Sequence, residues 1–184
     1  MEQEHEEMLV SMAETMRSRF YGKYRGIVVD VNDPDNLGRI TAQVPEILQQ
    51  ETSPWALPAV PFAGPAHGLV LIPEVGDGVW IEFEAGDPSR PIWTGGWWAK
   101  DELPAPGGTQ ARVLVTSTGH KLVLDDQNKE IHLVHSGGAE IKMTDSDISL
   151  KIGNTEITMT SSDLILKVGS SAQVKLSASG TAVS

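Results

Sequence analysis

The sequence contains no cysteine, and this absence removes several classes of chemistry at once. A chain without thiols forms no disulfide framework, carries no thiolate nucleophile and offers no cysteine-ligated zinc site. Basic residues are scarce too, with 14 Lys and Arg against 25 Asp and Glu, a formal net charge of −11 over 184 residues. Because phosphate contacts need clustered Lys and Arg, this balance argues against a nucleic-acid partner.

Long apolar runs are also missing, although apolar residues make up 40% of the chain. No run approaches the roughly 20 residues that span a membrane. The opening residues MEQEHEEM are acidic and lack the basic start and apolar stretch of a signal peptide. We therefore expect a chain of one or two small domains, made in the cytoplasm without a signal peptide.

Residues 1–19 have the periodicity of an amphipathic helix. Met8, Met12, Met16 and Phe20 recur every four residues and form one apolar stripe. Glutamates gather at the start and arginines near the end, as the helix dipole favours. Because a helix of this length is marginal in water, we expect it to pack on its own domain or on a partner.

Residues 20–101 predict short strands separated by turn-forming residues. The expected strands are residues 25–31, 39–45, 69–72, 78–83 and 91–95. Several short strands in about 80 residues favour a small closed barrel. A proline-rich stretch at 49–65 is expected to be a long loop held down by Trp55, and residues 102–111 form a linker by composition.

Two arginines follow turns in this region. Arg39 comes after the turn at residues 32–38, and Arg90 comes after Gly86-Asp87-Pro88-Ser89. Either guanidinium could hold a carboxylate such as Asp35 or Asp87. A structural role of this kind is favoured over ligand binding.

Residues 112–184 contain a short repeat. Seven apolar–X–apolar triads have their centres at residues 123, 132, 142, 151, 158, 167 and 175, separated by polar turns. A period of seven to ten residues is typical of a solenoid. Each strand presents one apolar face to the interior, and the central residue of each triad is expected to face solvent.

One copy of this repeat would bury too little apolar surface, because each triad supplies only two inward side chains. We therefore expect three chains to wind together, each supplying one strand per layer around a threefold axis. The expected trimer-axis residues are the outer members of the triads: Leu122, Leu124, Ile131, Leu133, Ile141, Met143, Leu150, Ile152, Ile157, Met159, Leu166, Val168, Val174 and Leu176.

The sequence offers little that predicts catalysis. No nucleophile-elbow or phosphate-loop motif is present, and the paired carboxylates Asp125-Asp126 fall in a predicted turn. His132 and His135 are three apart on a strand and so point to opposite faces, which prevents one chain from using both for one metal ion. His135 could meet its symmetry copies on the axis and hold an ion there, or it lies in a turn. We predict no catalytic, cofactor-binding or metal-binding residue and no enzyme activity.

Tryptophan supplies five of the ten aromatic residues. Trp97 and Trp98, with Trp55, could form a platform on which a saccharide stacks, in a monomeric or dimeric binding module. Alternatively, the tryptophans fill the barrel or seal contacts between barrels.

At this point the chain resembles the central spike of contractile injection systems: phage baseplate assembly protein V and the valine–glycine-repeat spikes of type VI secretion. The most specific stretch is residues 73–95, PEVGDGVWIEF followed by GDPSRPIWTG. Supporting stretches are 24–28 (YRGIV), 33–40 (DPDNLGRI), 55–64 and 118–126 (TGHKLVLDD).

The resemblance implies an all-β fold: an N-terminal OB-fold barrel at 20–101, then an intertwined trimeric β-helix needle at 112–184, with a short N-terminal α-helix. It also implies a structural role in the baseplate of a virion or injection particle. A homotrimer would link the hub to a piercing tip and contact the target membrane only on firing.

Three departures from the family pattern shape the expected partners. Only residues 102–111 separate barrel from needle, so no lysozyme domain is inserted there. Fewer than 25 residues precede the barrel, which suggests that the hub is a separate chain. The last residues, SASGTAVS, contain no histidine pair for iron, so a separate PAAR-type cap is expected at the tip. The sequence does not distinguish a phage from an extracellular or membrane-anchored system.

Overall fold

A computed structural model describes residues 2–184. The chain forms two compact units, Met1–Asp101 and Glu102–Ser184, which we describe separately. The division falls at the start of the linker expected from composition.

The first unit begins with helix α1 (Glu2–Arg17), as the periodicity predicts. The stripe residues Met8, Met12 and Met16 are 51%, 56% and 74% exposed. From His5 to Arg17, every side chain whose exposure is described is exposed, so α1 is not packed into the core of its own unit.

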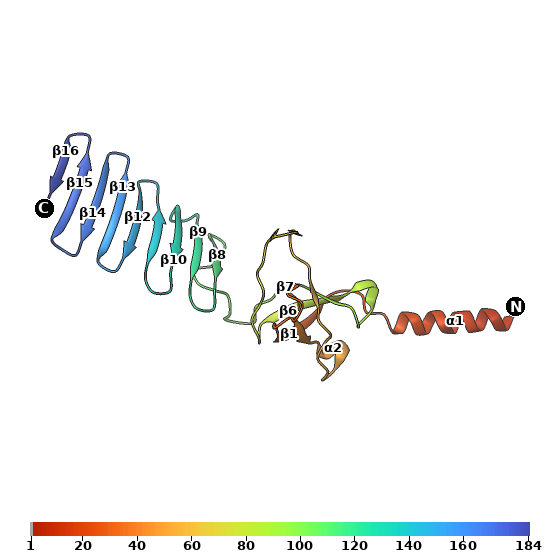
Figure 1. Cartoon of the computed structure of the whole chain (residues 1–184). Helices are drawn as coiled ribbons and strands as arrows, with labels where there is room; N and C mark the ends of the chain where they lie inside the picture. The colour runs from red at the N-terminus through yellow and green to blue at the C-terminus, as the bar shows by residue number, and fades with distance from the viewer. Residues whose placement is uncertain (1) are drawn as a thin grey trace. The chain divides into compact units, whose positions relative to one another are not determined.

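A five-stranded sheet with the order β2-β1-β6-β7-β3 forms the body of this unit (Figure 1). Its strands are β1 (Tyr24–Asp30), β2 (Thr41–Gln43), β3 (Leu57–Pro58), β6 (Gly78–Phe83) and β7 (Pro91–Gly96). A short helix, α2 (Pro45–Leu48), follows β2, and the 3-10 turn η1 (Glu84–Gly86) joins β6 to β7. Bridges Ile40↔Ala56 and Gln43↔Thr52 join the β2 edge to the segment before β3, so the sheet curls into the expected barrel.

Alternation along the strands fills the barrel. On β6, Val79, Ile81 and Phe83 are buried, whereas Trp80 and Glu82 lie on the half-exposed face. The buried core comprises Val28, Ile40, Ala42, Val44, Ala56, Val79, Ile81, Phe83 and Trp93. Gly26 permits this packing, because a Cβ there would lie 3.0 Å from Cγ1 of Ile81.

Two strand predictions in the barrel are corrected. The strand expected at 39–45 is shorter, because helix α2 begins at Pro45. The strand expected at 69–72 is wrong: these residues belong to a projecting loop without ladder partners. We call residues 60–73 the arm; its tip is closed by the two-residue strands β4 (Ala63–Gly64) and β5 (His67–Gly68).

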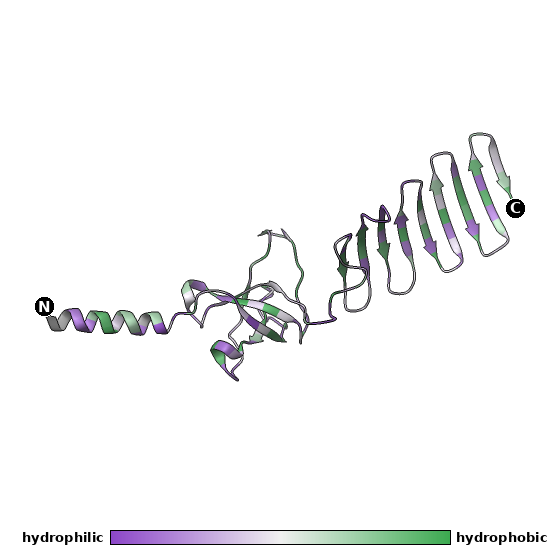
Figure 2. Cartoon of the chain, turned by 180° about the vertical axis from the view of Figure 1, so that it is seen from behind, coloured by the Kyte–Doolittle hydropathy of each residue, from purple (hydrophilic) through white to green (hydrophobic). Residues whose placement is uncertain are grey.

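The second unit is one nine-stranded antiparallel sheet in which sequence neighbours pair in order (Figures 1 and 2). Its strands are β8 (Ala111–Val115), β9 (Lys121–Asp125), β10 (Glu130–Val134), β11 (Glu140–Met143), β12 (Asp147–Ile152), β13 (Thr155–Thr160), β14 (Asp163–Val168), β15 (Ala172–Ser177) and β16 (Gly180–Val183).

The pairing in this sheet differs from the expected intertwined winding. Connections of two to five residues return each strand beside the preceding one. The β12–β13 turn, for example, uses Gly153 at φ 55°, a left-handed conformation that glycine adopts without strain. Each interior strand from β9 to β15 therefore has both ladder neighbours in its own chain, and other chains do not supply them.

Candidate functional site

The register of the second sheet gathers the predicted axis residues on one face. One row runs Leu122↔Leu133↔Ile141↔Leu150↔Ile157↔Leu166↔Val174 across seven strands. A parallel row runs Leu124↔Ile131↔Met143↔Ile148↔Met159↔Leu164↔Leu176. Ile152 and Val168 lie on the same face, linked through Thr155. We call this surface the apolar face.

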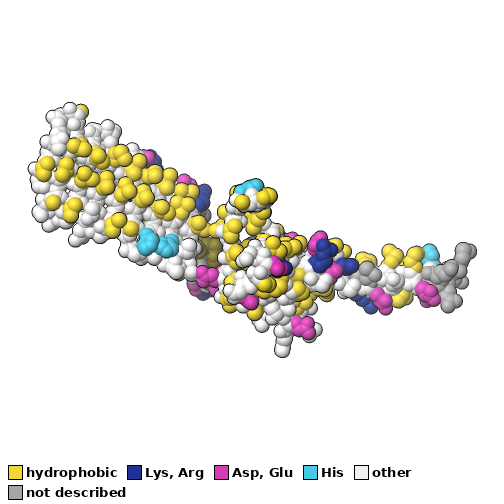
Figure 3. All heavy atoms as spheres, in the orientation of Figure 1, with side chains coloured by type: hydrophobic (Ala, Val, Ile, Leu, Met, Phe, Trp, Pro, Cys, Tyr) yellow, Lys and Arg dark blue, Asp and Glu magenta, His cyan; other side chains and the backbone are white. Residues whose placement is uncertain are grey.

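The apolar face is uncovered in the single chain (Figure 3). Val174 is half-buried, and the other thirteen predicted residues are exposed, from 36% for Ile141 to 71% for Ile152. An exposed apolar surface that crosses seven strands is far larger than the scattered apolar residues of an ordinary monomer surface.

Sequence reasoning missed Ile148 and Leu164, which complete the second row, and Leu114, which pairs with Leu122. The triad template covered three residues per strand, whereas β12 and β14 are six residues long. Extending the alternation by two residues in each strand would have found Ile148 and Leu164.

The opposite face of the sheet is polar and internally paired. Lys142 binds Glu130 at 2.7 Å, Lys175 binds Asp163 at 3.1 Å, and Glu140 accepts from His132 at 2.9 Å. The hydrogen bond from His132, followed by the hydrogen bond from Lys151, lowers the pKa of Glu140, and the bond to Glu130 raises the pKa of Lys142. Cross-strand pairs of this kind stabilise the polar face within the single chain. The apolar face has no such internal partners, so it is the candidate assembly surface.

His132 lies on β10, whereas His135 comes directly after the strand, in the turn that Gly138 closes by donating its N–H to the His135 carbonyl. His135 is exposed, its ring centroid 4.6 Å from that of His120. Its Nδ1 accepts the Gly137 N–H at 2.9 Å, and Nδ1 of His120 accepts the Ser136 N–H at 3.2 Å. Both Nδ1 atoms are thus occupied by backbone N–H donors of the turn after β10. Within residues 2–184 no three His, Asp or Glu side chains form a metal-binding group.

The turn after β1 is organised by one carboxylate. Asp33, whose side chain is 4% exposed, accepts the backbone N–H groups of Asp35, Leu37 and Arg39 at 3.1, 2.7 and 3.2 Å. Arg39 donates to it from Nε at 3.0 Å and Nη2 at 2.6 Å. These bonds, the Arg39 side chain foremost, hold the pKa of Asp33 well below its usual range.

The two arginine predictions have different outcomes. Arg39 also pairs with Asp35, as expected. Arg90 pairs with Glu84. Asp87 is instead held by Ser89, whose hydroxyl and backbone N–H donate to it at 2.8 and 3.0 Å, and Arg19 lies 3.6 Å away. Both sets of contacts brace the barrel.

The tryptophans have separate partners. Trp93 is buried and donates from Nε1 to the Gly38 carbonyl at 3.1 Å. Trp97 donates to the Val79 carbonyl at 3.1 Å, and the Arg25 guanidinium lies 5.3 Å from its ring. Trp55 packs with Arg39, and Trp98 is 65% exposed. Among the ring contacts of residues 2–184 none joins two tryptophans.

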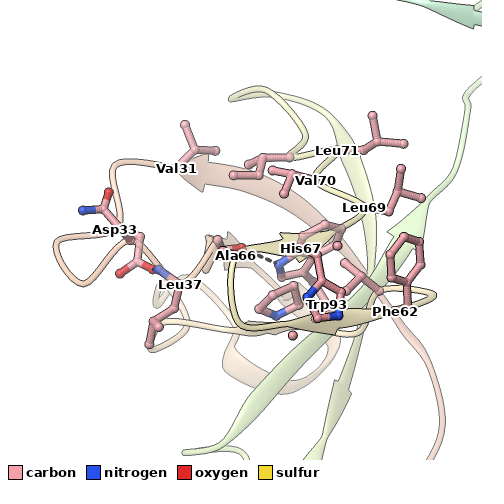
Figure 4. A pocket seen from close by; sticks show the side chains of 18 of the residues that line it. Val31, Asp33, Leu37, Phe62, Ala66, His67, Leu69, Val70, Leu71 and Trp93 are labelled. Atoms are coloured by element: carbon pink, nitrogen blue, oxygen red, sulfur yellow. Dashed lines mark hydrogen bonds between the residues drawn. The ribbon is translucent and has the colours of Figure 1, made fainter.

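A pocket of about 720 Å³ lies between the arm and the Asp33 turn (Figure 4). Its walls are mainly apolar, including Leu37, Phe62, Val70, Leu71 and Trp93.

Across the described chain, no helix is long and apolar enough to cross a membrane.

Comparisons with known proteins identify the barrel. The model of the type VI secretion system/phage-baseplate injector OB domain matches residues 24–98. Over 65 residues the chain is 37% identical to the type VI secretion system spike protein VgrG3 of Vibrio cholerae serotype O1. That alignment covers 33% of this chain and only 6% of VgrG3, so it represents a small part of a much longer protein. The matches confirm the resemblance to injection-system spike proteins.

Proposed function

Because residues 24–98 match the model of the type VI secretion system/phage-baseplate injector OB domain, we propose that this chain is a structural spike of a contractile injection apparatus. The apparatus is a contractile phage tail or a phage-tail-like particle. The observation that carries the proposal is the uncovered apolar face, which belongs to the same chain as an injector barrel.

The proposal makes the spike a homotrimer. Three copies of the sheet surround a threefold axis and cover one another's apolar faces, so the fourteen predicted axis residues become the core. Covering the exposed part of one such side chain contributes about 1 kcal/mol. Fourteen side chains in each of three chains therefore contribute about 42 kcal/mol. This exceeds the cost of the two association steps, which is roughly 4–15 kcal/mol for each step. Each chain keeps its own hydrogen-bonded ladder, and the copies meet through side chains.

The remaining partners follow the resemblance. A hub protein sits at the barrel end, a PAAR-type cap closes the tip, and the assembled needle punctures the target envelope when the sheath contracts. The role is mechanical: a closed prism of three sheets resists bending, because bending must break ladder hydrogen bonds in all three. The paired charges of the polar face remain outside, in water.

The mass of the particle in solution tests the trimer. Light scattering on a sizing column should give three times 19.8 kDa, with early elution because a needle is elongated. A mass of twice 19.8 kDa would instead indicate two sheets packed face to face, and a monomer would overturn the proposal.

Matched aspartate variants test which face assembles. Leu150→Asp places three charges inside the proposed core and should abolish the trimer, because buried like charges are not tolerated. Ser149→Asp adds the same charge to the adjacent position on the polar face and should leave the trimer intact. A stable Leu150→Asp trimer would contradict the proposal.

A further inference from the structure

The arm combines a strand-forming sequence with the lack of a strand partner. Leu69, Val70, Leu71 and Ile72 favour β-structure by sequence. Leu69 donates its N–H to the Phe62 carbonyl at 3.3 Å at the tip, but within residues 2–184 the backbone groups of residues 70–72 make no hydrogen bond. The side chains are uncovered as well, with Val70 75% and Leu71 52% exposed. An apolar, unpaired segment of this kind is a template for pairing with another chain.

The barrel of the same copy cannot supply the missing partner. Its two edges are already joined through the bridges Ile40↔Ala56 and Gln43↔Thr52. The arm leaves the barrel after Ala59, whose N–H donates to the Trp93 carbonyl, and returns at Gly76, whose N–H donates to the Val28 carbonyl. Between these anchors the arm stands away from the sheet and leaves the 720 Å³ pocket beneath it (Figure 4).

The charge pattern of the chain indicates which partner fits. Residues 52–73 are the longest stretch without Asp, Glu, Lys or Arg. Copies that each carry −11 repel one another, so they meet most favourably through uncharged surface. The arm provides such a surface, and the one charged residue that lines its pocket, Asp33, is already paired with Arg39. The arm presents exposed apolar side chains, and the pocket presents a mainly apolar cavity that they fit.

We propose that the arm joins neighbouring copies in a head-to-tail ring: the Leu69–Ile72 limb of each copy lies against the arm and pocket of the next. A heterologous contact of this type closes after three copies if its rotation is 120°, and it then leaves no arm unpaired. This inference rests on the trimer proposed above and adds a second, barrel-level contact to the apolar face of the needle sheet.

Thiol labelling of the full chain tests it, because the protein has no cysteine of its own. Val70→Cys and the control Val29→Cys each place one thiol, at positions that are 75% and 38% exposed in the single chain. The single chain therefore predicts faster maleimide labelling at position 70. The ring predicts the reverse order, and in the native Val70→Cys trimer the thiol should label at least tenfold more slowly than after unfolding in urea.

The outcomes separate the two proposals. If the variants are trimers and Val70→Cys labels faster than Val29→Cys, the arm contact is overturned and the spike function stands; the arm would then be assigned to a different protein or to a lipid surface. A monomer overturns the trimer on which both proposals rest. Slow labelling of monomeric Val70→Cys shows that the chain covers its own arm, and this too overturns the ring.

Disulfide trapping identifies the partner. Leu37→Cys and Val70→Cys in one chain place thiols on the pocket and on the arm. Oxidation of the ring should join copies and give a band near three times 19.8 kDa on a denaturing gel without reductant. A disulfide that forms within single chains, leaving the band at 19.8 kDa, overturns the contact between copies.

Discussion

At the scale of single residues, Asp33 contributes more to the barrel than its place in a surface turn suggests. One carboxylate satisfies three backbone N–H groups and the Arg39 guanidinium, whereas Asp35 meets only the outer edge of Arg39 and is 64% exposed. An Asx-type turn with this many acceptor bonds fixes the reversal between β1 and β2.

Replacement of this carboxylate should therefore weaken the barrel. Asp33→Asn is expected to lower Tm by roughly 5 °C, because an amide accepts fewer of these bonds and loses the ion pair. Asp35→Asn makes the same chemical change at the exposed neighbour and should shift Tm by no more than about 1 °C. Thermal denaturation followed by circular dichroism measures both. Equal effects would disprove the central role of Asp33.

The lowered pKa of Asp33 also predicts a pH dependence. A carboxyl whose pKa is lower in the folded than in the unfolded state contributes stability above the unfolded value of 3.8, and this contribution is lost as pH falls through the folded pKa. The Tm difference between wild type and Asp33→Asn should thus be constant from about pH 7 to about pH 5 and shrink below about pH 4. A difference that grows on acidification would contradict this linkage.

At the scale of elements, β6 and the segment after β7 show how closely the barrel packs. Trp97 lies over Gly78, where an added Cβ would come within 2.6 Å of the indole ring. The indole N–H of Trp97 donates to the Val79 carbonyl and holds the ring in this position. Because residue 78 is a glycine, the segment that follows β7 packs directly against β6.

Gly78→Ala should displace that ring. We expect a loss of about 1–3 kcal/mol in the free energy of unfolding, together with a shift in tryptophan emission, because the indole must leave its contact. Gly108→Ala is the matched control, since open space surrounds that glycine and its φ lies outside the left-handed region. Urea denaturation measures both, and unchanged stability of Gly78→Ala would mean that the ring moves freely.

At the scale of the whole molecule, each unit leaves a large apolar surface uncovered, the arm and pocket in the first and the apolar face in the second, in addition to the exposed stripe of α1. Covering apolar surface lowers the free energy, so assembly through the arm and through the apolar face is favourable. Leu150→Asp and the Val70→Cys labelling experiment address them separately, because they lie in different compact units.

Much of the fold could be predicted because it depends on local patterns. The four-residue spacing of Met8, Met12 and Met16 predicted α1, and alternation predicted the buried residues of β6 and the shared face of the triads in the second unit. The family resemblance of the barrel was visible in GDGVWIEF and GDPSRPIWTG, since turn residues at fixed offsets define its hairpins.

The sequence by itself thus determined which side chains share a face and where the chain turns, because side-chain direction in a strand alternates with period two. Only the tertiary structure decided the pairing of elements. It placed neighbouring strands of the second unit in one sheet, paired Arg90 with Glu84, and left Leu69–Ile72 without a strand partner in the described chain. Pairing depends on which distant segments loop closure brings together, and no local pattern encodes that choice.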